Sequence, residues 1–204
     1  METDFVQHFR VTDTDDLLRI AQNFGRPVPT RPGGPLVDVL FPRAMTTLSR
    51  SLSDRFGRDS FPYHTDMAYS RRVPRFLLMM SARASACATT VCDPTPLLSD
   101  RRLVHELLSA VYLIRRRRGS FLASVLDRDD AGGYVWRYDP QCMSPTSKQG
   151  DALLHELRAK LDVLPASRFQ WNAGEALVLN NHRVLHGREP VQEERRLIYR
   201  IAVT

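Results

Sequence analysis

The sequence predicts a mainly β protein with flanking helices (α+β), in which two sheets form a jelly roll, or double-stranded β-helix. Eight short segments have strand-like composition and are separated by turns rich in Gly, Pro and Asn. Only three segments have helical periodicity, too few to alternate with the strands as in a doubly wound parallel sheet. At 204 residues, the chain has the length of one domain. We therefore expect a single jelly-roll domain over residues 1–204.

The three predicted helices share a polar start and a stripe of apolar residues at helical spacing. They span residues 13–24, 99–111 and 151–161. Asp13 is a capping residue before the first helix, and Gly25 ends it. His105 and His155 lie on the second and third helices, and both are expected to be exposed.

The predicted strands are short and rich in apolar and β-branched residues. They span residues 35–41, 75–84, 88–92, 120–126, 133–138, 169–171, 175–179 and 197–203. A barrel of this kind has an open end, where side chains that are distant in the sequence can converge on one ligand.

The positive charge of the chain does not indicate a nucleic-acid partner. The net charge is +6, and 27 of the 29 basic residues are arginines, a bias that a GC-rich coding sequence explains more simply than phosphate binding. The densest run, residues 115–118, follows an amphipathic segment and is predicted to cap the end of that helix. We expect no nucleic acid among the partners.

Membrane association and disulfides are not expected either. No apolar stretch approaches the ~20 residues that a bilayer span needs, and the N-terminus has no signal-peptide pattern. Cys87, Cys92 and Cys142 are odd in number and lack C-x-x-C spacing, so they are interpreted as buried thiols. These features favour a cytoplasmic protein, and they leave its oligomeric state open.

Two histidines and one carboxylate form the most informative pattern. His64 and Asp66 are two residues apart, so in an extended strand they point to the same side. His186 follows 122 residues later, after a strand and an Asn-Asn turn. Two imidazoles and a carboxylate are the protein ligands of non-haem Fe(II) oxygenases, which leave the opposite face of the metal open. The pattern predicts a metal site formed by His64, Asp66 and His186.

Two other classes of protein remain as alternatives. His182 and His186 are four residues apart, as in some zinc hydrolases, but no Glu follows His182 and the flanking residues favour strands over a helix. A non-catalytic jelly-roll binding protein, or an enzyme that has lost its activity, is the second alternative. The presence of His64, Asp66 and His186 together with Thr90 and Arg200 argues against the second alternative, because a protein without activity has no reason to keep the whole set.

The last predicted strand carries two arginines on one face. Alternation places Arg196, Ile198 and Arg200 together, and Leu197, Tyr199 and Ile201 on the other side. A buried guanidinium is unfavourable unless an anion meets it, and a carboxylate is the natural partner. The residues alone leave open whether the arginine face points inward or to solvent.

Five blocks of sequence resemble one family. They are residues 61–66 (Phe-Pro-Tyr-His-Thr-Asp), 74–78, 88–93, 171–188 with His186-Gly-Arg188, and 196–203. In this order they resemble the Fe(II)/2-oxoglutarate-dependent dioxygenases of the taurine dioxygenase and clavaminate synthase-like family. The segment 136–139 (Trp-Arg-Tyr-Asp) is also similar to this group. The resemblance covers about residue 60 to the C-terminus.

The resemblance implies a compact clavaminate synthase-like fold and a role for each matching residue. His64, Asp66 and His186 would bind Fe(II). Thr90, or less favourably Thr89, would bind the distal carboxylate of the co-substrate 2-oxoglutarate, and Arg200, 14 residues after His186, would pair with it. Arg196 would be the reserve candidate or a second contact to this anion.

The resemblance also implies the activity. O2 and 2-oxoglutarate would be consumed, succinate and CO2 released, and an unactivated C–H bond of a small molecule oxidised, most simply by hydroxylation. An amino acid or a natural-product intermediate of specialised metabolism is the expected substrate. The loop 67–73 that follows the His-x-Asp motif is a candidate lid, in which Arg71 or Arg72 would meet a substrate carboxylate, and Tyr63 is a further candidate substrate contact. A solvated loop with two surface arginines is the alternative for Arg71 and Arg72.

Overall fold

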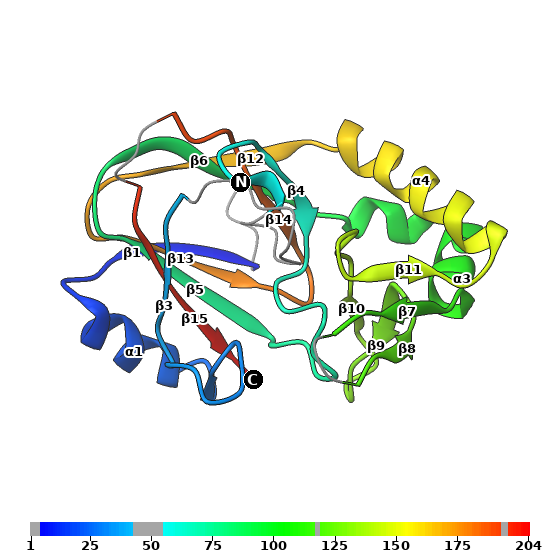
Figure 1. The fold of residues 1–204 in the computed structure, drawn as a ribbon, viewed down its shortest axis with the longest axis horizontal. Helices are drawn as coiled ribbons and strands as arrows, with labels where there is room; N and C mark the ends of the chain where they lie inside the picture. The colour runs from blue at the N-terminus through cyan, green and yellow to red at the C-terminus, as the bar shows by residue number, and fades with distance from the viewer. Residues whose placement is uncertain (1–4, 43–54, 117–118, 193–195) are drawn as a thin grey trace.

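Two antiparallel sheets face each other and make up the left-hand part of the molecule in Figure 1. The computed structural model describes residues 5–42, 55–116, 119–192 and 196–204. The larger sheet has the order β1 (Val6–Arg10), β13 (Glu175–Asn180), β5 (Phe76–Ser81), β15 (Ile198–Val203) and β2 (Pro27–Val28), and β3 (Asp38–Leu40) also pairs with β15. The smaller sheet has the order β12 (Ala166–Trp171), β6 (Ser85–Cys92), β14 (Leu185–Arg188) and β4 (Phe61–His64).

The space between the sheets holds an apolar core. Its buried members come from both sheets and include Leu77, Met79, Val91, Trp171 and Ile198. Alternation along β5 and β15 places Leu78, Met80 and Ile201 on the opposite face of the larger sheet, in a second cluster. The side chains of β15 that face the smaller sheet are therefore those of Ile198, Arg200 and Ala202.

Helix α1 (Thr14–Gln22) covers the outer face of the larger sheet. The side chain of Asp13 accepts a hydrogen bond from the backbone N–H of Asp16 and caps its first turn. Leu17 and Ala21 lie on the apolar stripe of α1 and are fully buried against the sheet. This helix closes the side of the sheet that does not face the site.

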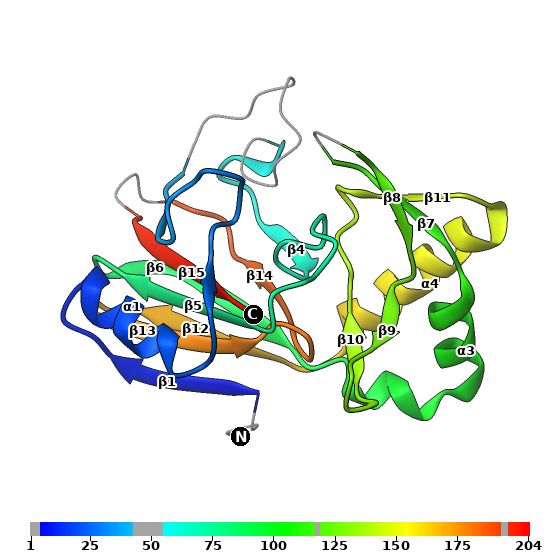
Figure 2. The same cartoon turned by 90° about the horizontal axis from the view of Figure 1, so that it is seen from below.

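A second group of elements lies to one side of the two sheets (Figure 2). It consists of η1 (Thr95–Ser99), α3 (Arg101–Ser109), β7 (Tyr112–Ile114), β8 (Phe121–Ala123), β9 (Leu126–Arg128), β10 (Tyr134–Trp136), β11 (Met143–Pro145) and α4 (Lys148–Val163). Its core is continuous with Cys92 and Leu185 on the outer face of the smaller sheet. The segment after β10 therefore leads directly to the back of β4 and β14.

The predicted mainly β architecture with three flanking helices is confirmed, and the boundaries differ locally. Predicted strand 120–126 is divided into β8 and β9, and the short strands β1, β2, β7 and β11 were not predicted. The helix-capping role predicted for residues 115–118 is wrong, because α3 ends at Ser109 and β7 intervenes. Residues 117 and 118 lie outside the described residues.

Two further expectations are met in the described part of the chain. The three cysteines are buried and form no disulfide among the described residues, as their odd number and spacing indicated. His105 and His155 are exposed on α3 and α4. No helix among the described residues is long and apolar enough to cross a membrane.

Candidate metal centre

Two histidines from different strands meet between the sheets. Strands β4 and β14 are antiparallel neighbours, and His64 lies directly opposite His186 in their register. Residues that oppose each other in neighbouring strands point to the same face, so both imidazoles enter the same space. The ring centroids are 4.4 Å apart, and both side chains are buried.

Asp66 completes the group, although it does not lie on the strand. Strand β4 ends at His64, and Asp66 begins a turn, so the extended geometry expected from His64 to Asp66 holds only for its first residue. Thr65 points to the other side, where its hydroxyl donates to the carbonyl of Trp136 at 3.1 Å. Asp66 is thereby directed toward the side occupied by the histidines.

The charge state of Asp66 suits a metal ligand. Burial alone raises the pKa of its carboxyl, but the Arg200 guanidinium and the His186 and His64 imidazoles outweigh burial and hold the pKa below its usual value. Nη1 of Arg200 lies 3.1 and 2.8 Å from the two carboxylate oxygens. The backbone N–H of Met67 donates to Oδ1 at 2.9 Å. Asp66 is therefore ionised at neutral pH.

Both imidazoles have a nitrogen suited to a metal. Burial and, next, the nearby His64 lower the pKa of His186 to about 3, so its ring is neutral. The Nδ1 atom of His186 is buried and has no hydrogen-bond partner among the described residues. Nδ1 of His64 lies 3.0 Å from the carbonyl oxygen of Pro62. Because a carbonyl only accepts, a neutral His64 ring keeps its lone pair on Nε2.

The side chains of His64, His186 and Asp66 are of the types that bind Fe(II), although the Asp66 carboxylate forms an ion pair with Arg200. Two imidazoles and one carboxylate match the ligand type of a non-haem Fe(II) site. Within residues 5–42, 55–116, 119–192 and 196–204, no three such side chains are already arranged around one metal position. The Asp66 carboxylate is instead paired with Arg200. His64, His186 and a reoriented Asp66 are the residues that would hold the metal.

Arg200 lies on the inward face of β15, at the centre of a buried ion-pair network. Its Nη2 atom donates to Asp38 at 2.8 Å, in addition to the Nη1 contacts with Asp66. Burial lowers the pKa of Arg200, but the two carboxylates outweigh burial and raise it overall. The anion expected for an inward-facing arginine is present in the structure as Asp66 and Asp38.

The two threonines point in opposite directions. Thr89 pairs with Arg188 and shares the inward face with Val91, whereas Thr90 pairs with Gly187 on the outer face. The Thr89 hydroxyl accepts a hydrogen bond from Nε1 of Trp171 at 3.1 Å. This orientation favours Thr89 over Thr90 as the candidate, because Thr89 faces the space that holds the histidines and Thr90 does not.

Arg196 is buried close to Arg188. Burial and the nearby charge of Arg196 lower the pKa of Arg188 to about 10. Arg188 itself donates to the carbonyl oxygens of Gly57 and Asp59. The role of Arg196 as a second anion contact stays a prediction.

The candidate substrate contacts lie outside the space between the sheets. Tyr63 points to the back of β4, where it lines a cavity of about 460 Å³ with Tyr138 and Arg158. Arg71 is exposed, and its guanidinium lies 5.2 Å from the centre of the Phe121 ring. Arg72 is also exposed. The solvated-loop interpretation fits both arginines better than contact with a ligand at the metal centre.

His182 does not share a site with His186. It precedes β14 in a turn, and its Nε2 lies 2.9 Å from the carbonyl oxygen of Val73. The two histidines are therefore not on one face of a helix, and the zinc-hydrolase alternative loses its basis.

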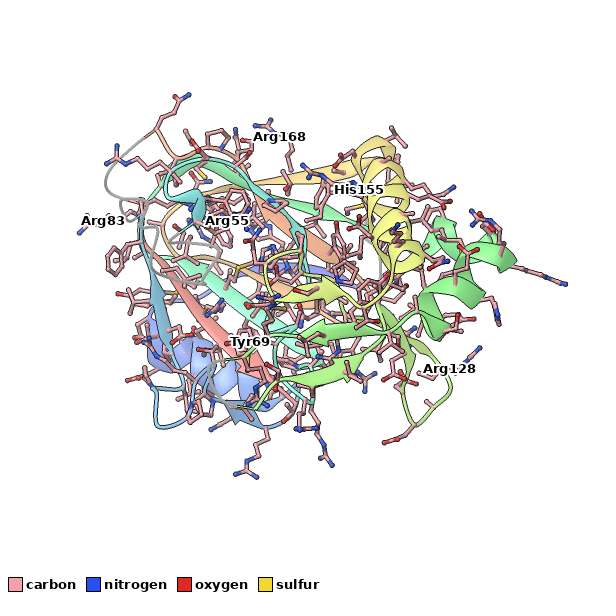
Figure 3. The ribbon with its side chains drawn as sticks, turned by 45° about the vertical axis from the view of Figure 1, so that its right-hand side comes forward. Arg55, Tyr69, Arg83, Arg128, His155 and Arg168 are labelled. Atoms are coloured by element: carbon pink, nitrogen blue, oxygen red, sulfur yellow. The ribbon has the colours of Figure 1, made fainter. Side chains whose placement is uncertain are left out.

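Figure 3 shows His155 on α4 and Arg128 in the second group of elements, away from Tyr69 beside the sheets.

Asn181 clamps the backbone of Asp66 and was not identified from the sequence. Its Oδ1 accepts from the N–H of Asp66 at 2.9 Å, and its Nδ2 donates to the carbonyls of Asp66 at 3.1 Å and Pro74 at 2.9 Å. Asn181 is fully buried. The only sequence signal was its place in the Asn-Asn turn, which gives no indication of a partner 115 residues away.

Arg137 secures the loop that follows the metal motif. The guanidinium is buried, and it donates to the backbone carbonyls of Ala68, Ser70 and Arg71. Burial lowers the pKa of Arg137. Three acceptors from one loop on one guanidinium fix the loop's path past the site.

Asp139 is a further carboxyl group close to the centre. It is buried, and burial raises its pKa although the nearby His64 opposes that effect. Its Oδ1 accepts from the N–H of Gln141 at 2.8 Å. Asp139 ends the Trp-Arg-Tyr-Asp segment that carried part of the family resemblance, so a signal for it was present.

Gly187 allows β14 to approach β4. A Cβ at this position would lie 2.7 Å from the carbonyl oxygen of Phe61 and 2.9 Å from Oγ1 of Thr90. Both distances are shorter than side-chain contacts allow. The glycine therefore permits the pairing that brings His186 opposite His64.

Solved structures similar to this one include two oxygenases. An asparagine oxygenase in complex with Fe(II), 3-hydroxyasparagine and succinate has a TM-score of 0.77 at 20% identity, over 92% of this chain and 63% of that chain. The non-haem iron oxygenase OrfP with Fe and α-ketoglutaric acid has a TM-score of 0.77 at 19% identity, over 100% of this chain and 75% of that chain. At this identity the likeness shows the fold, and this chain spans about two thirds to three quarters of their lengths.

The family itself is shown by sequence. No curated protein matches the chain significantly. The model of the taurine catabolism dioxygenase TauD, TfdA family matches residues 5–202, nearly the whole chain. The chain therefore belongs to the TauD/TfdA family of Fe(II)/2-oxoglutarate-dependent oxygenases.

Proposed function

We propose that the protein is an Fe(II)- and 2-oxoglutarate-dependent oxygenase that hydroxylates an unactivated C–H bond of a small molecule, with release of succinate and CO2. The observation that carries this proposal is the pairing of His64 with His186 beside an ionised Asp66. His64, Asp66 and His186 would hold Fe(II). When bound, iron and 2-oxoglutarate would activate O2, the oxidant, which oxidises 2-oxoglutarate to succinate and CO2 and hydroxylates the C–H bond.

The chain's own residues would bind and orient the co-substrate. Arg200 would pair with its distal carboxylate, and Thr89, with Thr90 as the alternative, would donate a hydroxyl to it. Arg196 would be a second anion contact. The apolar core around Val91 and Ile198 would keep water away from this region.

An amino acid is the substrate class that we favour. The asparagine oxygenase structure contains 3-hydroxyasparagine, and an OrfP structure contains (3S)-hydroxy-L-Arg. In this chain, the buried carboxyl of Asp139 near His64 is suited to meet a cationic amino or guanidinium group, which would favour its ionised form. A role in specialised metabolism and a cytoplasmic location remain predictions from the sequence.

The test is substrate-dependent turnover. The purified protein with Fe(II), ascorbate, O2 and 2-oxoglutarate is incubated with the standard L-amino acids, and products are measured by mass spectrometry. We expect one substrate to gain 16 Da with an equivalent amount of succinate. His64→Ala should abolish both products, whereas His155→Ala, a surface histidine on α4, should not change them. A protein that binds neither Fe(II) nor 2-oxoglutarate would instead support a non-catalytic jelly-roll protein.

A further inference from the structure

Asp38 holds one end of the Arg200 guanidinium. In the pairing of β3 with β15, Asp38 lies directly opposite Arg200, so the two side chains share the inward face. Oδ2 of Asp38 accepts from Nη2 of Arg200 at 2.8 Å, and the same oxygen accepts from the Thr30 hydroxyl. The Asp38 side chain is 7% exposed. A second strand of the larger sheet thus fixes the orientation of this arginine.

The other end of the guanidinium is on Asp66. Nη1 of Arg200 contacts both oxygens of that carboxylate, and Nη2 contacts Asp38. Arg200 therefore neutralises two buried carboxylates, one of which is a candidate metal ligand. A metal that takes Asp66 removes one of the two counter-ions of Arg200.

The remaining counter-ion decides whether that transfer is favourable. A buried guanidinium that loses its only partner is strongly destabilised, whereas one that keeps a hydrogen-bonded carboxylate is not. Asp38 is held by the strand pairing and by Thr30, and it does not depend on Asp66 for its position. Arg200 can release Asp66 and remain paired.

We propose that Asp38 is a positioning residue, which holds Arg200 through Nη2 and stays its counter-ion when Asp66 turns to the metal, so that Nη1 is left for the co-substrate carboxylate. This inference rests on the proposed function. In the ligand-free protein, Asp66 occupies the donor that 2-oxoglutarate would later use. Binding of metal and binding of 2-oxoglutarate therefore favour each other through Arg200 as well as through direct chelation.

Neutralising Asp38 should change this coupling in a specific direction. In Asp38→Asn, Asp66 becomes the only carboxylate on Arg200, so a metal must separate a pair that has no substitute. We expect the affinity for Mn²⁺ without 2-oxoglutarate to fall by about tenfold, a size typical of coupling between sites. Added 2-oxoglutarate supplies the missing anion and should restore much of the affinity. A purely structural role of Asp38 would not give this rescue.

The experiment measures Mn²⁺ dissociation constants by calorimetry on metal-free protein, with and without saturating 2-oxoglutarate. For each variant, the Mn²⁺ dissociation constant without 2-oxoglutarate is divided by the constant with 2-oxoglutarate. This ratio is compared between variants whose folding is checked by circular dichroism. We expect the ratio to be about fivefold larger in Asp38→Asn than in the wild type, and close to the wild-type ratio in Asp38→Glu, which keeps the charge. The matched control is Asp129→Asn. Asp129 lies in the second group of elements and forms an ion pair with Arg183, so its neutralisation should leave the ratio unchanged.

Thr30→Val provides a milder variant if Asp38→Asn does not fold. It removes the hydroxyl that orients Asp38, and the ratio should increase in the same direction by about twofold, the lower end of the effect of one lost hydrogen bond. An unchanged ratio in either folded variant, with normal wild-type binding, would overturn the role of Asp38 alone. A wild-type protein that binds neither Mn²⁺ nor 2-oxoglutarate would overturn the proposed function and this inference together.

Discussion

Replacing Asn181 with alanine should loosen the turn that carries Asp66. The change removes three hydrogen bonds, two to the backbone of Asp66 and one to Pro74, at a fully buried position. Each contributes about 1 kcal/mol net, and an amide left buried without a partner costs about 1–3 kcal/mol. We expect the free energy of unfolding to fall by about 3–4 kcal/mol.

The assay is urea unfolding followed by circular dichroism, with thermal unfolding as a second readout. For a chain of this length, a loss of 3 kcal/mol corresponds to a decrease in Tm of about 6–12 °C. Mn²⁺ affinity should fall by about 10–100-fold, because residues that orient metal ligands have effects of this size. Asn180→Ala is the matched control, since the side chain of Asn180 accepts a hydrogen bond from the backbone N–H of His182 and does not contact Asp66 in the described part of the chain.

An Asn181→Ala protein with the wild-type free energy of unfolding and wild-type Mn²⁺ affinity would refute the clamp. The same conclusion would follow if Asn180→Ala were equally destabilised, because the effect would then belong to the turn and not to the contacts with Asp66.

Three further predictions concern the surroundings of the site. Gly187→Ala should destabilise the protein by about 1–3 kcal/mol and weaken Mn²⁺ binding, because the new Cβ meets the Phe61 carbonyl. The control is Gly150→Ala, whose Cβ would meet only ordinary van der Waals contacts. Equal Mn²⁺ affinity in the two variants would contradict the role of Gly187. Arg137→Met should speed hydrogen exchange of residues 68–72 and lower stability by about 2 kcal/mol, while Arg128→Met at the surface should change stability by less than about 0.5 kcal/mol. The metal-free protein should lose stability as the pH falls below about 6.5, because the pKa of His186 is about 3 in the folded state and ordinary in the unfolded state. The free energy of unfolding should be about 2 kcal/mol lower at pH 5 than at pH 7 for this reason. An unfolding free energy that does not change between pH 7 and pH 5 would contradict the prediction.

The architecture was accessible from the sequence where a pattern is local. Helix α1 has its acidic first turn and its apolar stripe within nine residues, directly after its cap Asp13, so it was predicted closely. Strands β1 and β2 were missed, because they lie at sheet edges and their partly exposed residues show no clear alternation. Strand β7 was missed because three residues are too few to show a period.

In the candidate site too, the features predicted from the sequence are those with a local pattern. His64, Asp66 and His186 were identified by residue type, spacing and family resemblance, and strand alternation grouped Arg196 with Arg200. Their role in binding Fe(II) and 2-oxoglutarate stays a prediction. The orientation of Thr89 over Thr90 follows from the register of β6 with β14, which no local pattern contains.

The supporting residues could not be predicted because their partners are remote. Asp38 meets Arg200 across 162 residues, and Arg137 meets the carbonyl of Ala68 across 69. Such contacts are set by strand pairing and chain closure, and an Asp or Arg alone does not indicate them. The sequence therefore indicated the residues proposed to bind metal and co-substrate, but it did not indicate the residues that hold those side chains and loops in position.

The most direct test of the central claim is an anaerobic titration with Fe(II) and 2-oxoglutarate, followed by visible absorption. Chelation of Fe(II) by a keto acid gives a weak charge-transfer band, and we expect this band to appear at one equivalent of each ligand. The band should be absent in His186→Ala and shifted to higher 2-oxoglutarate concentration in Arg200→Gln. A wild-type protein without the band, or a His186→Ala protein that keeps it, would contradict the assignment of the metal centre.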